Sequence, residues 1–154
     1  MSPKLILMCG LPGSGKTTRA KKLEHEQKLV RLSPDEWILN LYDHRLDHEH
    51  HEQAREQVEK LQWELAKRLL ILRQSVVLEN GFWSRNDRQK HRKEAQALGA
   101  EVYIDYEDVP IEELWRRASI RPETQDVGML HFTKKDLEEW VNIFEPPTTD
   151  ELAN

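Results

Sequence analysis

A glycine-rich segment near the start of the sequence carries its clearest chemistry. Residues 9–18 read CGLPGSGKTT, and the pattern G-x-x-x-x-G-K-[ST] runs from Gly10 to Thr17. In this pattern backbone N–H groups surround phosphate oxygens, and the N-terminus of the following helix adds partial positive charge. The sequence therefore predicts a nucleotide site formed by Gly10, Pro12, Gly13, Ser14, Gly15, Lys16, Thr17 and Thr18.

Two residues of this segment have separate expected roles. Lys16 is expected to reach the β- and γ-phosphates, and the hydroxyl of Thr17 is expected to hold Mg²⁺. A glycine-rich turn without a ligand is the alternative, but the motif lies between an expected strand and an expected helix, which is the context of a true phosphate-binding loop. We therefore expect ATP and Mg²⁺ as cofactors.

The patterning along the chain predicts an α/β fold. Short apolar runs indicate strands at 4–9, 28–32, 75–79 and 101–106. Helices are expected at about 16–26, 34–41, 49–73 and 85–98, after Pro110 and from Thr133. Strands that alternate with helices indicate a parallel sheet with helices on both faces. We expect one domain over residues 1–145 and an extended tail over 146–154.

Composition narrows the class of protein. A chain of 154 residues suits one domain, and its net charge of −5 gives no support to a general affinity for nucleic acid. The one cysteine, Cys9, excludes an internal disulfide and is expected to be buried. Because we see neither a signal peptide nor an 18-residue apolar stretch, we expect a cytoplasmic protein without a membrane partner.

A phosphate-binding loop does not by itself name a reaction. The sequence contains neither N-K-x-D nor D-x-x-G, which argues against a GTPase. A motor ATPase would need a longer chain and usually a partner subunit. A small kinase fits the length, and it needs a base, contacts to an acceptor, and cations around the transferred phosphoryl group.

Four segments carry a resemblance to a known group. GLPGSGKTT, LSPDEW, VVLENGFWSRNDR and DVPIEELWRRASIR resemble, in order and spacing, the small P-loop kinase-like proteins of the AAA_33 group. That group is similar to the kinase domain of polynucleotide kinase, the zeta toxins and chloramphenicol phosphotransferase. The resemblance covers about residues 4–145. It implies a three-layer, nucleoside-kinase-like P-loop fold with strand order 2-3-1-4, a helical lid and phosphoryl transfer, and leaves the acceptor open.

The resemblance implies a catalytic base. Asp35 follows the second expected strand and lies in the first turn of a helix, where polynucleotide-kinase-like enzymes have the general base for the acceptor hydroxyl. A carboxylate there can accept the proton as the oxygen attacks phosphorus. The alternative is that Asp35 only interacts favourably with the helix dipole.

The resemblance also implies lid arginines that stabilise the transition state. Arg117 and Arg121 are four residues apart, so both can face one side of a helix end. Arg116 competes for the same role, and solvated surface arginines are the alternative.

Several polar residues are candidates for metal or acceptor contacts. Glu79 and Asn80 end the third expected strand, where ligands bind in parallel sheets, and Glu79 is a candidate magnesium ligand. A merely polar strand end is equally compatible. Asn80, Arg85, Arg88 and Arg45 are candidate acceptor contacts, although Arg85 and Arg88 also suit the start of an ordinary charged helix.

Aromatic and histidine residues give weaker signals. Trp37, Phe82 and Trp83 could stack on a ring, but core packing is favoured for Trp37. Trp63, Trp115 and Trp140 lie on apolar helix stripes and are expected to pack. For the histidines at 44, 48, 50 and 51, a solvated face is favoured over a zinc site.

The sequence favours one function and leaves two alternatives. The favoured function is transfer of the γ-phosphoryl group of Mg-ATP to a hydroxyl-bearing acceptor, with Asp35 as base. One alternative is a nucleotide-binding regulator or partner-dependent ATPase that docks through the helix at 49–73. The other is a 5′-end kinase of RNA or DNA, which the acidic net charge disfavours.

Overall fold

A four-stranded parallel sheet forms the centre of the molecule. The computed structural model describes residues 1–43, 45–120 and 132–153. The strands are β1 (Lys4–Cys9), β2 (Val30–Leu32), β3 (Val76–Gly81) and β4 (Glu101–Tyr106). They are ordered β2-β3-β1-β4, and Leu7 of β1 pairs with Leu78 on one side and Ile104 on the other. The α/β class and the strand order expected from the sequence are confirmed.

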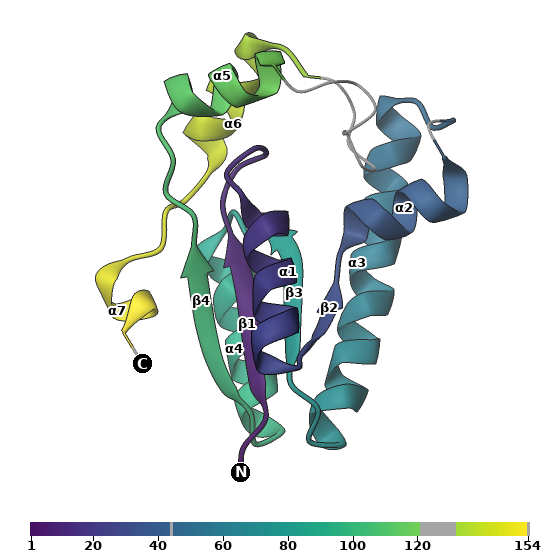
Figure 1. Cartoon of the computed structure of the whole chain (residues 1–154), viewed down its shortest axis with the longest axis vertical. Helices are drawn as coiled ribbons and strands as arrows, with labels where there is room; N and C mark the ends of the chain where they lie inside the picture. The colour runs from purple at the N-terminus through teal and green to yellow at the C-terminus, as the bar shows by residue number, and fades with distance from the viewer. Residues whose placement is uncertain (44, 121–131, 154) are drawn as a thin grey trace.

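Helices cover both faces of this sheet (Figure 1). In chain order they are α1 (Lys16–Gln27), α2 (Pro34–Tyr42), α3 (His48–Ile71), α4 (Arg85–Ala97), α5 (Ile111–Ile120), α6 (Lys134–Ile143) and α7 (Thr149–Leu152). On one face Ala20 and Leu23 of α1 pack against β1 and β3. On the other face Trp63 of α3 and Ala95 of α4 join the larger core cluster. The result is the three-layer arrangement that the sequence predicts.

The central strand is buried on both faces. Leu5, Leu7 and Cys9 belong to the cluster under α3 and α4, whereas Ile6 and Met8 belong to the cluster under α1. This explains why the strand has a continuous apolar sequence rather than an alternating one. Burial raises the pKa of the Cys9 thiol to about 11, and Sγ contacts the carbonyl oxygen of Phe82 at 3.3 Å.

Two helices form a lid over the carboxyl end of the sheet. Figure 1 shows α5 and α6 beyond the tips of the strands, with α2 and the start of α3 on the opposite side of this end. Leu114 of α5 and Leu137 of α6 pack with Leu11 of the glycine-rich loop. The lid therefore rests on the loop that precedes α1. The expected loop of the lid, with Arg121, lies outside the described residues.

The C-terminal segment differs from the extended tail that the sequence predicts. Thr148 and Glu151 form a capping box that starts helix α7. Glu151 is 2% exposed and accepts hydrogen bonds from the fully buried Arg88 of α4 at 2.9 and 3.1 Å. Arg88 also donates to the carbonyl oxygen of Phe82, the residue that directly follows β3. The segment is thus attached to the loop that follows a central strand.

None of the helices within the described ranges combines the length and the apolar character that a membrane span requires.

The Arg88–Glu151 pair predicts a large effect of one substitution. Glu151→Gln leaves the buried guanidinium without its carboxylate, and we expect the free energy of unfolding to fall by about 3 kcal/mol. Denaturant titration of both proteins measures this difference. Asp150→Asn, which removes the charge of an exposed carboxylate that contacts Arg85 and the Thr148 hydroxyl, is the control and should cost less than about 1 kcal/mol.

The same pair predicts a pH dependence of stability. Burial alone would raise the pKa of Glu151, but hydrogen bonds from Arg88, Thr148 and Gln89 outweigh it and lower the pKa from 4.5 to about 2. The pair therefore stabilises fully above pH 4.5, and its contribution is lost as the pH falls towards 2. The difference between wild type and Glu151→Gln should shrink over this interval. A difference that is constant with pH would contradict the assignment.

Candidate functional site

The loop between β1 and α1 has the geometry of a phosphate-binding loop. Gly15 has φ 99°, a left-handed conformation that favours glycine, and no side chain caps the N-terminus of α1. A Cβ atom on Gly10 would lie 2.6 Å from Ser14 Oγ and 3.1 Å from the Glu107 carbonyl oxygen. The glycines therefore let the backbone turn tightly and leave the first N–H groups of α1 available to an anion.

Lys16 lies at the centre of this loop. Its Nζ donates to the carbonyl oxygens of Gly10 at 3.0 Å and Leu11 at 2.9 Å. Burial lowers the pKa of Lys16 to about 8, although the nearby carboxylates of Asp35 and Glu79 raise it. A positive charge is thus held inside the site at neutral pH, at the cost of desolvation.

Asp35 faces the same space from the start of α2. Ser33 caps this helix by accepting from the backbone N–H of Glu36 at 3.3 Å, and Pro34 occupies its first position. This sequence places Asp35 in the first turn, at the carboxyl end of β2. Its side chain is 26% exposed and lines the cavity described below.

Arg55 of α3 holds Asp35 in place. Its Nη1 donates to Asp35 Oδ1 at 2.5 Å, and its Nη2 donates to the backbone carbonyl oxygen of Asn80 at 3.0 Å. Its Nε lies 3.4 Å from Glu59 Oε1. One guanidinium therefore connects α2, α3 and the end of β3.

Glu79 and Thr17 lie together, as the sequence predicts for a shared metal. The Thr17 hydroxyl donates to Glu79 Oε1, and Arg31 Nη1 donates to Glu79 Oε2 at 2.6 Å. Arg31 also pairs with Glu36 at 2.5 Å and Glu24 at 3.7 Å. A hydroxyl and a buried carboxylate at the start of α1 are oxygen ligands of the kind that Mg²⁺ prefers.

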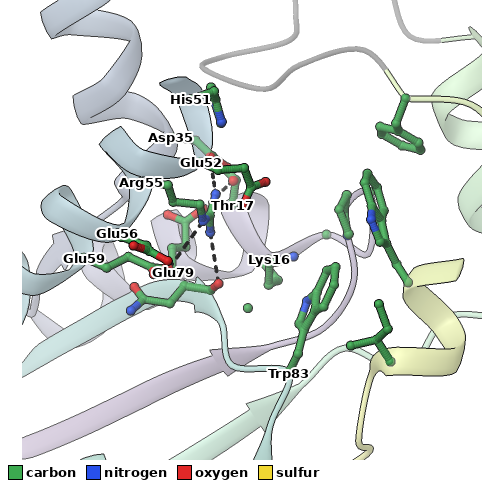
Figure 2. Close-up of a pocket in the computed structure, with 18 of the residues that line it drawn as sticks. Lys16, Thr17, Asp35, His51, Glu52, Arg55, Glu56, Glu59, Glu79 and Trp83 are labelled. Carbon is green, nitrogen blue, oxygen red and sulfur yellow. Dashed lines mark hydrogen bonds and ion pairs between the residues drawn. The ribbon is translucent and has the colours of Figure 1, made fainter. Parts of the chain in front are cut away.

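A cavity of about 540 Å³ joins these groups (Figure 2). The glycine-rich loop, with Lys16 and Thr17, forms its floor, and Asp35 and α3 form one wall. The end of β3, the loop after it and the lid contribute the other lining residues. Figure 2 shows Asp35 and Arg55 on one side of Lys16 and Trp83 on the other. The cavity is large enough for a small molecule next to a phosphate group.

Of the expected lid arginines, one reaches the loop. Arg117 Nη1 donates to the carbonyl oxygen of Gly13 at 3.0 Å, and its Nε donates to Glu113 at 3.1 Å. Arg116 instead pairs with Glu113, and its side chain is 61% exposed. The structure therefore places Arg117 rather than Arg116 beside the phosphate-binding loop. Arg121 lies outside the described residues.

The candidate acceptor contacts divide into two groups. Asn80 lines the cavity, but its backbone carbonyl is engaged by Arg55. Arg85 donates to the Thr148 hydroxyl and pairs with Asp150 and Glu151 of the C-terminal segment, away from the cavity lining. Arg45 donates to carbonyl oxygens of its own preceding helix and is exposed. The structure brings only Asn80 of these three to the cavity.

The aromatic residues also divide. Phe82 is buried in the core, where Trp63 and the partly buried Trp37 pack as well. Trp83 and Trp140 line the cavity with ring centroids 5.9 Å apart. The expectation that Trp140 only packs is therefore too narrow, because one side of it contacts the lid core and another faces the site.

The histidine segment is the first turn of α3. Asp47 caps the helix, and His50 Nδ1 lies 2.8 Å from its carboxylate. His51 lines the cavity. Within the part of the chain that the structure describes, no group of three or more histidine, cysteine or acidic side chains is arranged to hold a metal ion. His44 lies outside that part.

The sequence analysis did not predict that charged residues of α3 line the cavity. Glu52, Arg55, Glu56 and Glu59 all line the cavity and follow the spacing i, i+3, i+4, i+7. This spacing places charged residues on one helix face, and it was a detectable signal. What the sequence could not indicate is that this face turns towards the phosphate-binding loop rather than towards solvent.

Comparisons with known proteins agree with this geometry. The AAA_33 family model, described as an AAA domain, matches residues 5–147. A candidate kinase from Chloroflexus aurantiacus superposes with a TM-score of 0.80 at 21% identity, over 97% of this chain and 84% of that one. A search of curated protein sequences finds no significant match.

Two further solved structures share the fold. A chain of the Pnkp1/Rnl/Hen1 RNA repair complex has a TM-score of 0.72 at 26% identity, over 92% of this chain and 44% of that one. Kti12 from Chaetomium thermophilum, solved with ADP-AlF3, has a TM-score of 0.64 at 23% identity, over 94% and 81% of the two chains. The fold is that of P-loop kinases, a group of nucleotide-binding proteins.

The lowered pKa of Lys16 predicts how nucleotide affinity depends on pH. A bound phosphate stabilises the protonated amine, so the complex binds more protons than the free protein above pH 8. We expect the affinity for ATP to fall as the pH rises from 7.5 to 9.5, approaching roughly tenfold per pH unit at the upper end.

Calorimetric titration of ATP across this range tests the prediction. Lys16→Met should bind weakly and without this pH dependence, whereas Lys22→Met, on the exposed side of α1, should retain it. A flat profile in the wild type would contradict the assigned role of Lys16.

Proposed function

Because the chain belongs to the AAA_33 family of P-loop proteins, we propose that it is a kinase that transfers the γ-phosphoryl group of ATP to a hydroxyl group of an acceptor bound in the cavity. The observation that carries the proposal is that Asp35 and the phosphate-binding loop line the same cavity. A regulator needs the loop but has little use for a carboxylate base beside a cavity that could hold an acceptor. This favours transfer over a purely regulatory role.

Asp35 is proposed as the general base. The acceptor oxygen attacks the γ-phosphorus, its proton passes to Asp35, and the bond between the γ-phosphorus and the bridging oxygen breaks to release ADP. Arg55 engages Asp35 Oδ1, and Oδ2 forms no hydrogen bond with the described residues. The free oxygen is thus the one left to accept the proton, while Arg55 orients the carboxylate.

Positive charge around the phosphates is proposed to stabilise the transition state. Lys16 lies in the loop, and Arg117 donates to the Gly13 carbonyl at its edge. Both cations are fixed by backbone carbonyl oxygens before a nucleotide is bound, so little reorganisation is needed when charge develops. Arg121 remains a predicted contributor.

Magnesium is the metal that these residues would hold. Its ligands would come from the Thr17 hydroxyl and the Glu79 carboxylate, which already contact each other. When bound, Mg²⁺ neutralises charge on the phosphate oxygens. Arg31 orients the second oxygen of Glu79 at 2.6 Å and so prepares the carboxylate.

Transfer of labelled phosphate tests the proposed reaction. With [γ-³²P]ATP and a panel of nucleosides, 5′-hydroxyl oligonucleotides, sugars and amine-bearing alcohols, we expect label on one acceptor class. Asp35→Asn should lower the rate by about 10²–10⁴-fold with ATP affinity largely retained, because the amide oxygen can still accept a hydrogen bond from Arg55 but cannot take the proton. Asp108→Asn, an exposed carboxylate outside the cavity lining, is the matched control.

Two results would contradict the proposal. Unchanged transfer by Asp35→Asn would remove this residue from the base role. Label only in free phosphate across the panel, with ATP still bound, would favour the regulator or partner-dependent ATPase.

Glu79→Gln tests the metal assignment. We expect the Mg²⁺ concentration for half-maximal transfer to rise by about 10–100-fold, because an amide is a weaker ligand than a carboxylate and no longer orients Thr17 in the same way. This concentration is measured by following the transfer rate at a fixed ATP concentration while the Mg²⁺ concentration is varied. An unaltered magnesium dependence would assign Glu79 to the acceptor or to structure alone.

A further inference from the structure

The cavity has an excess of negative charge on the side away from the phosphate-binding loop. Its charged lining residues are Asp35, Glu52, Glu56, Glu59 and Glu79 against Lys16 and Arg55. Lys16 belongs to the loop and serves the phosphates. The wall formed by α2 and α3 therefore has one cation, Arg55, among several carboxylates.

The contacts of Arg55 leave it unavailable to an anionic ligand. Its guanidinium is shared by Asp35 at 2.5 Å, the Asn80 carbonyl oxygen at 3.0 Å and Glu59 at 3.4 Å. Burial would lower the pKa of Arg55, but its carboxylate partners raise it. The guanidinium therefore stays charged, and the carboxylates of Asp35 and Glu59 neutralise it. An acceptor with phosphate or carboxylate groups would have to displace one of these partners.

Two carboxylates of this wall have no cationic partner of this kind among the described residues. Glu52 and Glu56 lie one helical turn apart on α3, and neither forms a hydrogen bond or an ion pair with the described residues. Both are exposed. Figure 2 shows Glu52 beside Asp35, on the side of the cavity that faces Trp83 across Lys16. Figure 2 also shows Glu56 farther along α3, next to Glu59. Both carboxylates therefore border the cavity without a neutralising partner among the described residues.

The facing wall is aromatic and points to the same kind of ligand. Trp83, Phe132 and Trp140 line it, with ring centroids 5.9 Å apart for the tryptophan pair and 5.1 Å for Phe132 and Trp140. The indole N–H of Trp83 donates to the Gly10 carbonyl oxygen at 3.3 Å, which fixes the ring. Aromatic rings attract cations, and an ammonium group between such rings and carboxylates is stabilised from both sides.

We infer that the acceptor is a small amine-bearing alcohol, whose hydroxyl meets Asp35 and whose ammonium group lies between Glu52, Glu56 and the aromatic wall. The inference rests on the proposed kinase function and names its substrate class. Polyanionic acceptors such as 5′-hydroxyl oligonucleotides are disfavoured, because they would place phosphates against the unmatched carboxylates. Bound ATP adds negative charge to the cavity and strengthens this preference.

Matched acceptors test the charge requirement. Glucosamine, 2-deoxystreptamine and kanamycin are compared with their N-acetylated forms, with gluconate and with a 5′-hydroxyl dinucleotide. The hydroxyls remain available in each N-acetylated form, but the ammonium charge is lost. For at least one amine we expect kcat/KM to exceed that of its N-acetylated form by about tenfold or more, and the anionic compounds to be poorer still.

Variants assign the preference to the two glutamates. Glu52→Gln with Glu56→Gln should raise KM for the amine by about 10–100-fold with little change in kcat or in KM for ATP, and should narrow the gap to the N-acetylated form. The wild-type KM for the amine should also rise with salt. The control is Glu138→Gln with Glu139→Gln, two exposed carboxylates of α6 outside the cavity lining. Thermal unfolding confirms that both double variants are folded.

Binding measured without turnover separates the two proposals. Tryptophan fluorescence follows each compound in the presence of a non-hydrolysable ATP analogue. Amine binding that depends on Glu52 and Glu56, without transfer to any acceptor, would support the charge inference and contradict the kinase. Transfer to a neutral or anionic acceptor that the double variant leaves unchanged would support the kinase and overturn the inference.

Discussion

Strand β1 is buried on both faces, with leucines and Cys9 against one helical layer and Ile6 and Met8 against the other. It also pairs with β3 and β4 on its two edges. The glycine-rich loop begins directly after the carboxyl end of this enclosed strand, which fixes where the loop lies. Because all four strands are parallel, the ends of β2 and β3 meet the same region. The sheet therefore brings together Asp35, Glu79 and Lys16 from segments far apart in sequence.

Two arginines that are absent from the phosphate-binding motif organise the groups around it. Arg31 joins Glu79 to Glu24 and Glu36, and Arg55 joins Asp35 to α3 and to the end of β3. The Arg31 guanidinium contacts three carboxylates, and that of Arg55 contacts two carboxylates and a carbonyl oxygen. Several such partners fix the planar fork of an arginine side chain. The cavity is thereby divided into a cationic end at the glycine-rich loop and an acidic end at α2 and α3.

The sequence predicted the sheet order, the loop and the place of Asp35, because these depend on local patterns and on a resemblance covering most of the chain. It did not predict the role of Arg55 or the burial of Arg88, because each depends on a partner far along the chain. The error at the C-terminus has a different cause. The capping box of Thr148 and Glu151 is a local signal for a helix start, but the surrounding residues are too polar to indicate packing.

The single thiol of the protein can be used to measure how readily the central sheet opens. Cys9 is fully buried at the last position of β1, directly before the phosphate-binding loop, and its raised pKa keeps it protonated at neutral pH. Thiol reagents act on the exposed thiolate, so they reach this sulfur only when the central strand separates from its neighbours. The rate of Cys9 alkylation in native buffer therefore reports how often the sheet opens. A ligand that holds the loop against the lid slows this alkylation without contacting the sulfur.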